Sequence, residues 1–441
     1  MKLNYKKTIL VGFAFMSISL FWSLYDGEIQ LILSKYIDQN WLIGFIMAWD
    51  NILAVFMLPV FGSISDKTKT KWGRRMPYIV LGTIAASIFL VLTAVIDSLA
   101  SVIGGATLPL LMISLFLTLF SMSIYRSPAV ALMPDVTVKP LRSKANAIIN
   151  LMGALGGVIA LVSVPLLTGL EALKDEFGNV IKVEGNDIVL FSVIAALMLL
   201  LVAVLFITIK EPVLVKEKQE DDVRFGIEEV EEETKVEQPL SKPEMISLLL
   251  ILSSIFLWFM GYNAVTSAFS RYSMYHWNFK NYSTLLLVAN AGAILAFLPS
   301  AMLASKFGRR RTILVGVVLL TLTLGLATFL PEPNAFAYVL LFLAGVAWAC
   351  INVNSYPMVV ELSKNSNIGK YTGYYYAFSM AAQIVTPILS GLFIDNIGYE
   401  SLFPYGAIFS GLAFFTMFFV RHGDAKPAVP AAKLEVFDVD D

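Results

Sequence analysis

Four ionisable residues stand inside long apolar stretches of this 441-residue sequence, namely Asp26, Glu28, Asp50 and Arg126. A charged side chain in the core of a bilayer costs about 2.5–3.5 kcal/mol or more, so it usually faces a cavity or a partner. Burial favours the neutral form of a carboxyl group, whereas a nearby arginine favours its charged form. An acid subject to both effects could be neutral when it holds a proton and paired with Arg126 when it does not. These four residues are therefore candidates for a cation-coupling site.

Each of the four also has a structural interpretation. Asp26 and Glu28 are two residues apart, which is about 200° around a helix, so only one of them can face a cavity squarely. Either could instead lie at the outer water boundary. Asp50 could form an internal salt bridge or an interhelical hydrogen bond without any coupling, and Arg126 could belong to a purely structural ion pair.

The elements that carry these residues are apolar enough to cross a membrane. Hydrophobic residues make up 57% of the chain and charged residues 15%, against about 45–50% and about 25% in soluble domains. A spanning helix needs about 20 mostly apolar residues, and twelve runs meet this requirement. The sequence therefore predicts an all-α membrane protein with twelve transmembrane helices. Their approximate limits are 8–34, 41–64, 77–97, 107–133, 143–169, 187–209, 245–270, 281–304, 312–330, 335–361, 371–395 and 399–420.

The distribution of lysine and arginine predicts how these helices are oriented. If both termini are cytoplasmic, 26 of the 32 cations lie in inner segments and 5 in outer ones, with Arg126 inside a helix. Cytoplasmic loops carry such an excess of positive charge. We therefore expect a multi-pass protein of a bacterial-type plasma membrane, with both termini in the cytoplasm.

Several functional classes are disfavoured by composition. The net charge of −1 gives no basis for nucleic-acid binding. Cys350 is the only cysteine, which excludes an internal disulfide or a cysteine metal cluster. The sequence carries no zinc spacing, phosphate-binding loop or nucleophile motif, so we expect no enzymatic activity and no cofactor other than a coupling cation. The expected partners are a small-molecule substrate and the lipid bilayer, and we expect a monomer.

An acidic segment, residues 210–244, divides the chain into two halves that echo each other. Gly73-Arg74-Arg75 recurs 235 residues later as Gly308-Arg309-Arg310, and Asp135 and Glu361 close corresponding helices 226 residues apart. The predicted domains are an N-terminal six-helix bundle (1–209), an acidic cytoplasmic linker (210–244), a C-terminal six-helix bundle (245–422) and a disordered cytoplasmic tail (423–441).

The parallel repeat and the loop after the second run resemble the major facilitator superfamily. Its loop pattern G-x-x-x-D-x-x-x-x-K-x-G-R-[KR] is similar to Gly62-x-x-x-Asp66 followed by Gly73-Arg74-Arg75. The resemblance implies two pseudo-symmetric bundles with a substrate site near mid-membrane between them. It also implies a cytoplasmic gate that holds the halves closed in the outward-open state. The gate residues expected are Asp66, Gly73, Arg74, Arg75, Asp135, Arg142, Arg309, Arg310 and Glu361.

The stretch 61–79 more closely resembles the glycoside–pentoside–hexuronide group, and its sucrose–proton symporter branch in particular. That branch reads S-D-x(6)-G-R-R-x-P-[FY]-I here, and its fourth and fifth helices are similar to Pro128-x(5)-Pro134-Asp135 and Arg142-x-x-Ala145-Asn146. The resemblance covers the N-terminal half, and the C-terminal half is similar mostly at the superfamily level. It implies cation-coupled transport of a sugar.

Two departures from these relatives concern the coupling ion. The plant members carry an acid at the place of Leu119 and an arginine at the place of Val130, whereas this chain has Arg126 one turn earlier. The melibiose-type members carry two carboxylates on the second helix, whereas this chain has Asp50 alone. Neither known cation site therefore transfers directly. Glu28 is the preferred coupling residue, because the resemblance extends to the first helix.

A sugar site needs hydrogen-bonding groups together with flat apolar surfaces. Polar and aromatic residues near the middle of the spans are the candidates, and Asn352 occupies the repeat position of Arg126. Any of them could instead be interhelical contacts or face lipid. The candidates are Trp22, Trp49, Asn51, Trp258, Tyr262, Asn263, Asn290, Trp348, Asn352, Asn354, Tyr375 and Gln383.

Together these features predict a secondary active transporter that works by alternating access. We expect proton-coupled symport of a glycoside, with a disaccharide such as sucrose or maltose as the preferred substrate. A sodium-coupled sugar symporter, and an exporter or antiporter of another small organic solute, are the alternatives within the same class. A non-transporting sugar receptor is the alternative from another class, although the linker and tail are too short for a typical signalling domain.

Overall fold

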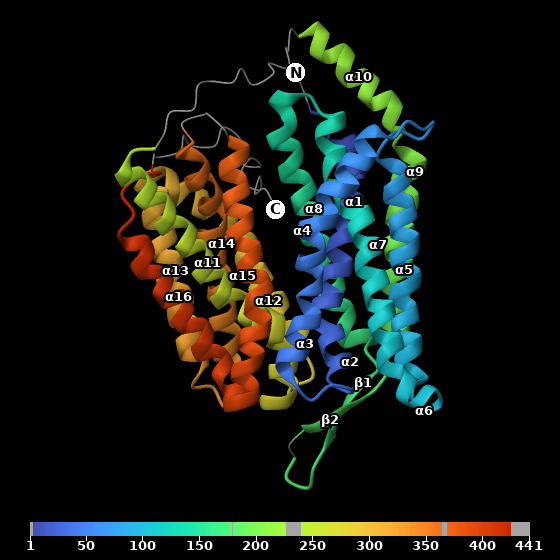
Figure 1. Cartoon of the computed structure of the whole chain (residues 1–441), viewed down its shortest axis with the longest axis vertical. Helices are drawn as coiled ribbons and strands as arrows, with labels where there is room; N and C mark the ends of the chain where they lie inside the picture. Colours follow the sequence, from blue (N-terminus) through green and yellow to red (C-terminus); the bar gives the residue numbers. More distant parts are fainter. Residues whose placement is uncertain (1–2, 179, 226–239, 364–367, 425–441) are drawn as a thin grey trace. The chain divides into compact units, whose positions relative to one another are not determined.

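The predicted all-α membrane fold is confirmed by the computed structural model, which describes residues 3–178, 180–225, 240–363 and 368–424. Within these residues, twelve helical segments are long and apolar enough to cross a membrane, from Tyr5–Leu33 to Tyr399–Phe418. Each satisfies its backbone groups internally, as a bilayer requires. Figure 1 labels the elements along the chain.

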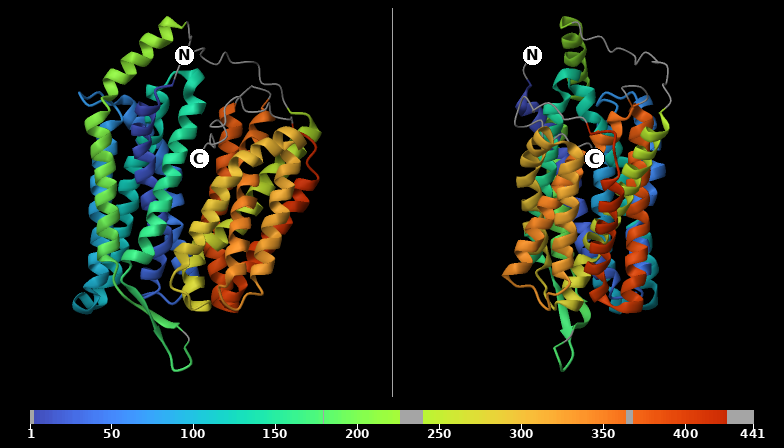
Figure 2. Two further views of the ribbon diagram at one scale, coloured as in Figure 1. Left: turned by 180° about the vertical axis from the view of Figure 1, so that it is seen from behind. Right: turned by 90° about the vertical axis from the view of Figure 1, so that its left-hand side faces the viewer.

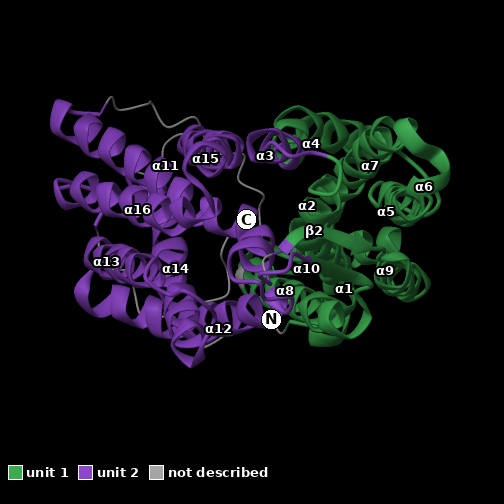
Figure 3. Ribbon diagram, turned by 90° about the horizontal axis from the view of Figure 1, so that it is seen from below, with its two compact units in different colours: residues 1–36, 49–173, 181–229 green, residues 37–48, 174–180, 230–441 purple. Residues whose placement is uncertain are grey.

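Two compact units make up the chain (Figure 3). Unit 1 comprises residues 1–36, 49–173 and 181–229, and unit 2 comprises residues 37–48, 174–180 and 230–441. The division predicted from the sequence assigns residues 37–48 to the N-terminal bundle. In the structure they group with unit 2, because α3 (Asn40–Met47) packs against α15 (Ile368–Ile397).

Unit 1 is built around the packing of α1 against α8 and α9, and of α7 against α4 and α5. Its elements are α1 (Tyr5–Leu24), the π-helix η1 (Tyr25–Ile29), α2 (Gln30–Leu33), α4 (Trp49–Lys67), α5 (Met76–Ser98), α6 (Ala100–Ile103), η2 (Gly104–Ala106), α7 (Thr107–Val136), η3 (Lys139–Leu141), α8 (Arg142–Leu167), α9 (Ile188–Thr208) and α10 (Glu211–Arg224).

Unit 2 is built around the packing of α14 against α12 and α13, and of α11 against α15 and α16. Besides α3 and α15, its elements are α11 (Lys242–Arg271), the π-helix η4 (Tyr272–His276), α12 (Tyr282–Phe307), α13 (Arg309–Ala327), α14 (Ala335–Glu361), η5 (Tyr399–Ser401) and α16 (Leu402–Phe418).

A π-helical turn interrupts the first span of each half. η1 follows α1 directly and η4 follows α11 directly, so the two turns occupy related places in the repeat. Such turns widen a helix locally and often occur at functional sites. η1 carries both Asp26 and Glu28, so the helical wheel assumed for these two residues does not apply.

Two elements outside the spans were not specified by the hydropathy pattern. The start of the acidic linker forms α10, and β1 (Leu170–Lys174) pairs with β2 (Val180–Gly185) after α8. α10 lies at one end of unit 1 and the base of the strand pair at the other (Figure 2). Of the tail predicted to be disordered (423–441), residues 425–441 lie outside the described residues, as do linker residues 226–239. Asp424 is described, and it accepts a hydrogen bond from the Arg310 amide at 2.8 Å.

The repeated Gly-Arg-Arg sequence forms the same kind of turn in both halves. Gly73 has φ +109° and Gly308 has φ +96°, in a region that side chains other than glycine rarely adopt. Each glycine therefore allows the chain to reverse tightly before a span. The arginines that follow are placed at the start of α5 and of α13.

Candidate functional site

Asp26, Asp50 and Arg126 come together on unit 1. They belong to η1, the first turn of α4 and α7, and the charge of Asp50 interacts with both Asp26 and Arg126. Asn51 Nδ2 donates a hydrogen bond to Asp50 Oδ1 at 2.8 Å. The guanidinium carbon of Arg126 lies 5.8 Å from the ring centre of Trp22. The structure thus joins three of the four predicted ionisable residues in one cluster.

Two aromatic residues adjoin this cluster with unused polar atoms. Trp22 and Tyr25 pack edge to face, with ring centres 5.7 Å apart. Trp22 Nε1 and the Tyr25 hydroxyl are buried and have no hydrogen-bond partner among the described residues. A buried polar group without a partner is costly, so such atoms are suited to receive a ligand group. Two hydrogen-bond donors, on Trp22 and Tyr25, therefore adjoin the cluster that contains the two carboxylates and Arg126.

Glu28 takes a different direction from Asp26. Asp26 is exposed, whereas Glu28 is 1% exposed and forms a side-chain hydrogen bond with Asp187, the residue before α9. The preference for Glu28 as the residue that faces a cavity therefore does not match its position, because its carboxyl points into the interior of unit 1. The π-helical turn separates the two acids between exposed and buried surroundings.

Lys35, Tyr36 and Asp97 form a second buried network in unit 1 that the sequence analysis missed. Lys35 Nζ and the Tyr36 hydroxyl each donate to Asp97 at 2.7 Å. Burial and this carboxylate raise the pKa of Tyr36 above its usual range. Asp97 and Asp187 fall at the limits of apolar runs, where they read as boundary residues. The sequence did contain one indication that these residues could meet. In the predicted topology, Asp97, Asp187 and Lys35 all lie at the outer ends of their spans.

The aromatic candidates of unit 2 include one close stack. The rings of Tyr262 on α11 and Trp348 on α14 are nearly parallel, with centres 3.7 Å apart, and Phe259 packs edge to face on Trp348. Beside Tyr262, Asn263 Nδ2 is buried without a hydrogen-bond partner among the described residues. Trp258, in contrast, is 0% exposed, so its ring belongs to the core of unit 2.

The remaining polar candidates differ in accessibility. Asn354 is buried, and its Nδ2 donates to Ser300 Oγ at 3.1 Å and to the Cys350 carbonyl at 2.9 Å, as an interhelical contact would. The buried Tyr375 lies 3.3 Å from Ser355 Oγ. Those that are at least partly accessible are Trp49, Asn51, Asn290, Asn352 and Gln383.

A polar clamp attaches α3 to unit 2, which the sequence did not indicate. Asp395 on α15 accepts hydrogen bonds from the backbone amides of Asn40 and Trp41 at 2.7 and 2.9 Å. Asn40 Oδ1 in turn accepts from Arg271 at 2.5 Å and from the Tyr399 hydroxyl at 3.0 Å. Asp395 therefore caps the first turn of a helix that lies 355 residues away in the chain.

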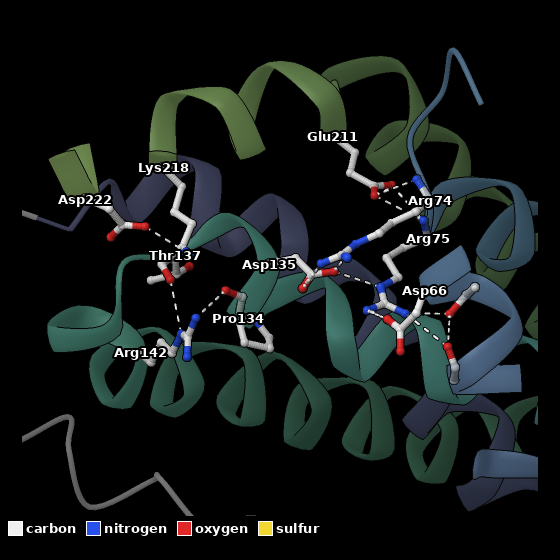
Figure 4. A network of polar contacts seen from close by, with 12 residues as sticks. Asp66, Arg74, Arg75, Pro134, Asp135, Thr137, Arg142, Glu211, Lys218 and Asp222 are labelled. Carbon is white, nitrogen blue, oxygen red and sulfur yellow. Dashed lines mark hydrogen bonds and ion pairs between the residues drawn. The ribbon is translucent and has the colours of Figure 1, made fainter. Parts of the chain in front are cut away.

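The gate residues of the N-terminal half form one network (Figure 4). Asp135 on α7 accepts from Arg74 at 2.6 Å and from Arg75 at 2.7 Å, and Arg75 also pairs with Asp66. Burial alone would lower the pKa of Arg75, but the two carboxylates raise it above its usual value. Arg142 is not part of these ion pairs; it donates to the carbonyls of Thr137 and Pro134 at 3.2 and 3.1 Å.

Glu211 completes this network, although the sequence analysis did not single it out. Its carboxylate accepts from the backbone amides of Arg74, Arg75 and Met76 at 2.8–3.1 Å. A carboxylate at a helix N-terminus satisfies amides that have no partner within the helix. The first residue of α10 thereby fixes the start of α5 (Figure 4).

The C-terminal half has a simpler counterpart. Arg309 pairs with Glu361 at 2.8 Å, as Arg74 and Arg75 do with Asp135 in the repeat. Arg310 donates through its backbone amide to Asp424 at 2.8 Å. The Arg309–Glu361 pair in unit 2 is thus the counterpart of the pairs that Arg74 and Arg75 form with Asp135 in unit 1.

Sequence comparisons match most of the chain to one family and parts of it to curated relatives. The model of the MFS/sugar transport protein family matches residues 34–405. The chain is 31% identical over 157 residues to a lactose permease of Lactobacillus helveticus, covering 33% of this chain and 23% of that one. It is 29% identical over 122 residues to an uncharacterised MFS-type transporter of Schizosaccharomyces pombe, covering 27% of each. These matches span about a quarter of each relative's length.

Solved structures confirm the predicted major facilitator fold. The nucleoside transporter NupG aligns with a TM-score of 0.64 at 13% identity, over 93% of this chain and 98% of that one. The xylose transporter XylE from E. coli, in a partially occluded inward-open conformation, aligns with a TM-score of 0.60 at 13% identity, over 94% and 99%. At such identities the likeness concerns the fold alone.

Proposed function

Because the chain belongs to the MFS/sugar transport protein family, we propose that it carries a glycoside across the plasma membrane in symport with a proton. Its family and fold identify it as a multi-pass membrane transporter of sugars or related solutes. The finer assignment, that cation coupling drives uptake by alternating access with both termini in the cytoplasm, is the proposal.

The observation that supports cation coupling is the cluster of Asp26, Asp50 and Arg126 on unit 1. Two acids share one cation, so the cluster can exist with or without an additional positive charge. Binding of a cation would change the charge near Trp22 and Tyr25, whose polar atoms have no protein partner among the described residues. Cation binding and sugar binding are thereby connected through neighbouring side chains.

Recognition of a sugar is assigned to groups that offer flat surfaces and hydrogen bonds. On unit 1 these are Trp22 and Tyr25, and on unit 2 the Tyr262–Trp348 stack together with Asn263. Aromatic faces suit the apolar side of a sugar ring, and the unpaired donors suit its hydroxyl groups. A disaccharide is the preferred substrate because of the likeness to a lactose permease and to the glycoside transporter group.

Uptake of labelled sugars into proteoliposomes tests this proposal. An inward pH gradient, with and without sodium, should drive accumulation of a disaccharide, and collapse of the gradient should abolish it. Asp50→Asn should reduce accumulation strongly, whereas Glu184→Gln, which removes an exposed carboxylate on β2, should not. Uptake that responds to sodium alone would assign the coupling ion to sodium, and binding without translocation would indicate a receptor.

A further inference from the structure

Four buried ionisable groups gather at the end of unit 1 that lies opposite Gly73. Glu28 is 1% and Asp187 0% exposed, and the side chains of Lys35 and Asp97 are 7% and 0% exposed. Three carboxyl groups and one ammonium group would carry a formal charge of −2 if all were ionised. Buried charges are tolerated only when they are paired. The fully ionised cluster would therefore be short of positive charge.

The one cation of this cluster is engaged by Asp97. Lys35 Nζ donates to Asp97 Oδ2 and to the Gly185 carbonyl, both at 2.7 Å. The Tyr36 hydroxyl donates to the other Asp97 oxygen at 2.7 Å. Both oxygens of Asp97 thus have donors, and Lys35 acts on Asp187 only through its charge. The excess negative charge falls on Glu28 and Asp187.

Asp187 has neutral donors on one oxygen only. Its Oδ1 accepts from the Thr168 hydroxyl at 2.8 Å and from the Gly169 amide at 3.0 Å. No N–H or hydroxyl among the described residues donates to the buried Oδ2. The Asp187 carboxyl also forms a side-chain hydrogen bond with the Glu28 carboxyl. Ionised carboxylates only accept hydrogen bonds, so one member of this pair must carry a proton.

We propose that Glu28 and Asp187 hold a single proton between them, and that the transported proton occupies this pair as well as the Asp26–Asp50 cluster in the course of the transport cycle. The second statement rests on the proposed function. Carboxyl groups that share a site behave in this way, because like charges in contact cannot both persist in a buried place. Burial also raises the pKa of Asp187, against the opposing influence of Glu28, Thr168, Gly169 and Lys35.

The π-helix η1 connects this proton to the cluster at Asp26. Glu28 and Asp26 share the turn, and Gln30 Nε2, at the start of α2, donates to the Asp26 carbonyl. Release of the proton would leave a second buried negative charge next to Asp97 and Lys35, and would disfavour the present contact between Glu28 and Asp187. Among the described residues, Lys35 acts on Asp187 through its charge, and Lys35 and Tyr36 donate to Asp97.

Infrared spectroscopy of the purified full-length protein tests whether the proton is present. Wild type should show absorption of a protonated carboxyl group at neutral pH that disappears at alkaline pH. Glu28→Gln and Asp187→Asn should each lose part of this absorption, whereas Glu184→Gln, an exposed carboxyl three residues from Asp187, should keep all of it. Absence of the band in wild type, or its full retention in both variants, would overturn the proposal.

Transport measurements test whether this proton is the one carried. With one proton per sugar, a gradient of about one pH unit can drive about tenfold accumulation. Glu28→Gln and Asp187→Asn should equilibrate the sugar without accumulating it, and Asp187→Glu should restore part of the accumulation. Glu184→Gln should accumulate the sugar as wild type does, because Glu184 is exposed. Normal accumulation in both variants would overturn the assignment.

The two measurements separate this inference from the proposed function. If wild type ignores the pH gradient but keeps the band and its loss in the variants, proton symport is wrong and the shared proton stands. If wild type follows the gradient and the variants keep both the band and the accumulation, symport stands and the Glu28–Asp187 site is wrong. The presence of the band is measured first in wild type, so the proposal remains testable even if a variant misfolds.

Discussion

At the scale of single residues, two carboxyl side chains within one turn of helix have opposite surroundings. Asp26 is exposed next to Asp50 and Arg126, whereas Glu28 is buried against Asp187. The sequence showed that these acids were unusual, because apolar surroundings make any charge costly. It could not show their directions, because a π-helical turn changes the angle between them and depends on tertiary packing.

Arg126 should be needed for gradient-driven uptake because its charge acts on Asp50, and the charge of Asp50 acts on Asp26. Arg126→Gln should lower the initial uptake rate at least about tenfold, the effect of about 1.4 kcal/mol, and Arg126→Lys should lower it less. Lys306→Gln serves as the control, since Lys306 is an exposed cation at the end of α12. Uptake by Arg126→Gln at the wild-type rate would show that the cation has no part in coupling.

Asp187 should make the folded protein less stable as the pH rises. The pKa of its buried carboxyl is raised above the usual value, which is about 3.9 in an unfolded chain. The contribution of this raised pKa to the stability of the folded protein is complete below the unfolded-state pKa. It is lost as the pH rises through the folded-state pKa. Melting temperatures in detergent across this range should fall more steeply for wild type and Glu184→Gln than for Asp187→Asn. Parallel profiles for all three proteins would contradict this expectation.

At the scale of elements, the spans were predictable and their interruptions were not. Hydropathy is a local property, so the twelve runs correspond to the twelve candidate spans. The break between α3 and α4, and the grouping of α3 with unit 2, arise from contacts with α15. Asn40 and Asp395 are 355 residues apart, and nothing in a single sequence indicates that they meet.

The cap on α3 should contribute measurably to the stability of unit 2. Asp395→Ala removes a carboxylate that accepts from two backbone amides and from the Asn40 side chain. A hydrogen bond to a charged group contributes about 1.5–3 kcal/mol, so the melting temperature in detergent should fall clearly. Asn396→Ala, at the exposed neighbouring position, should have a small effect. Equal melting temperatures for the two variants would mean that the cap does not stabilise α3.

The two arginines of the gate network should differ in importance. Arg75 has a 5% exposed side chain and pairs with Asp66 and Asp135, whereas the 39% exposed Arg74 pairs with Asp135. Breaking a buried ion pair costs about 3–5 kcal/mol, and an exposed one contributes about 0–1 kcal/mol. Arg75→Ala should therefore lower the melting temperature far more than Arg74→Ala. Both variants keep the backbone amides that donate to Glu211, so this contact is the same in the two proteins being compared.

At the scale of the whole molecule, the repeat explains why the arginine–carboxylate pairs after the second and eighth spans could be anticipated and the networks around Asp97 and Asp187 could not. Gly73 and Gly308 carry the same backbone conformation, and each is followed by an arginine that pairs with an acid at the end of a span. The Gly-Arg-Arg motif is short and occurs once in each half, so each copy strengthens the interpretation of the other. The Glu28–Asp187 pair has no counterpart in the sequence repeat, and it forms only when unit 1 folds.

The orientation that we predict for the chain rests on its distribution of positive charge and can be tested by labelling. In a background of Cys350→Ser, which removes the single cysteine, two exposed positions can each be replaced by cysteine: Lys69 beside α4 and Glu184 on β2. Because 26 of the 32 cations lie on the predicted inner side, a membrane-impermeant maleimide should label Glu184→Cys in intact cells. It should label Lys69→Cys only in inverted vesicles. The reverse pattern would place both ends of unit 1 on the opposite sides and would invert the direction of the proposed symport.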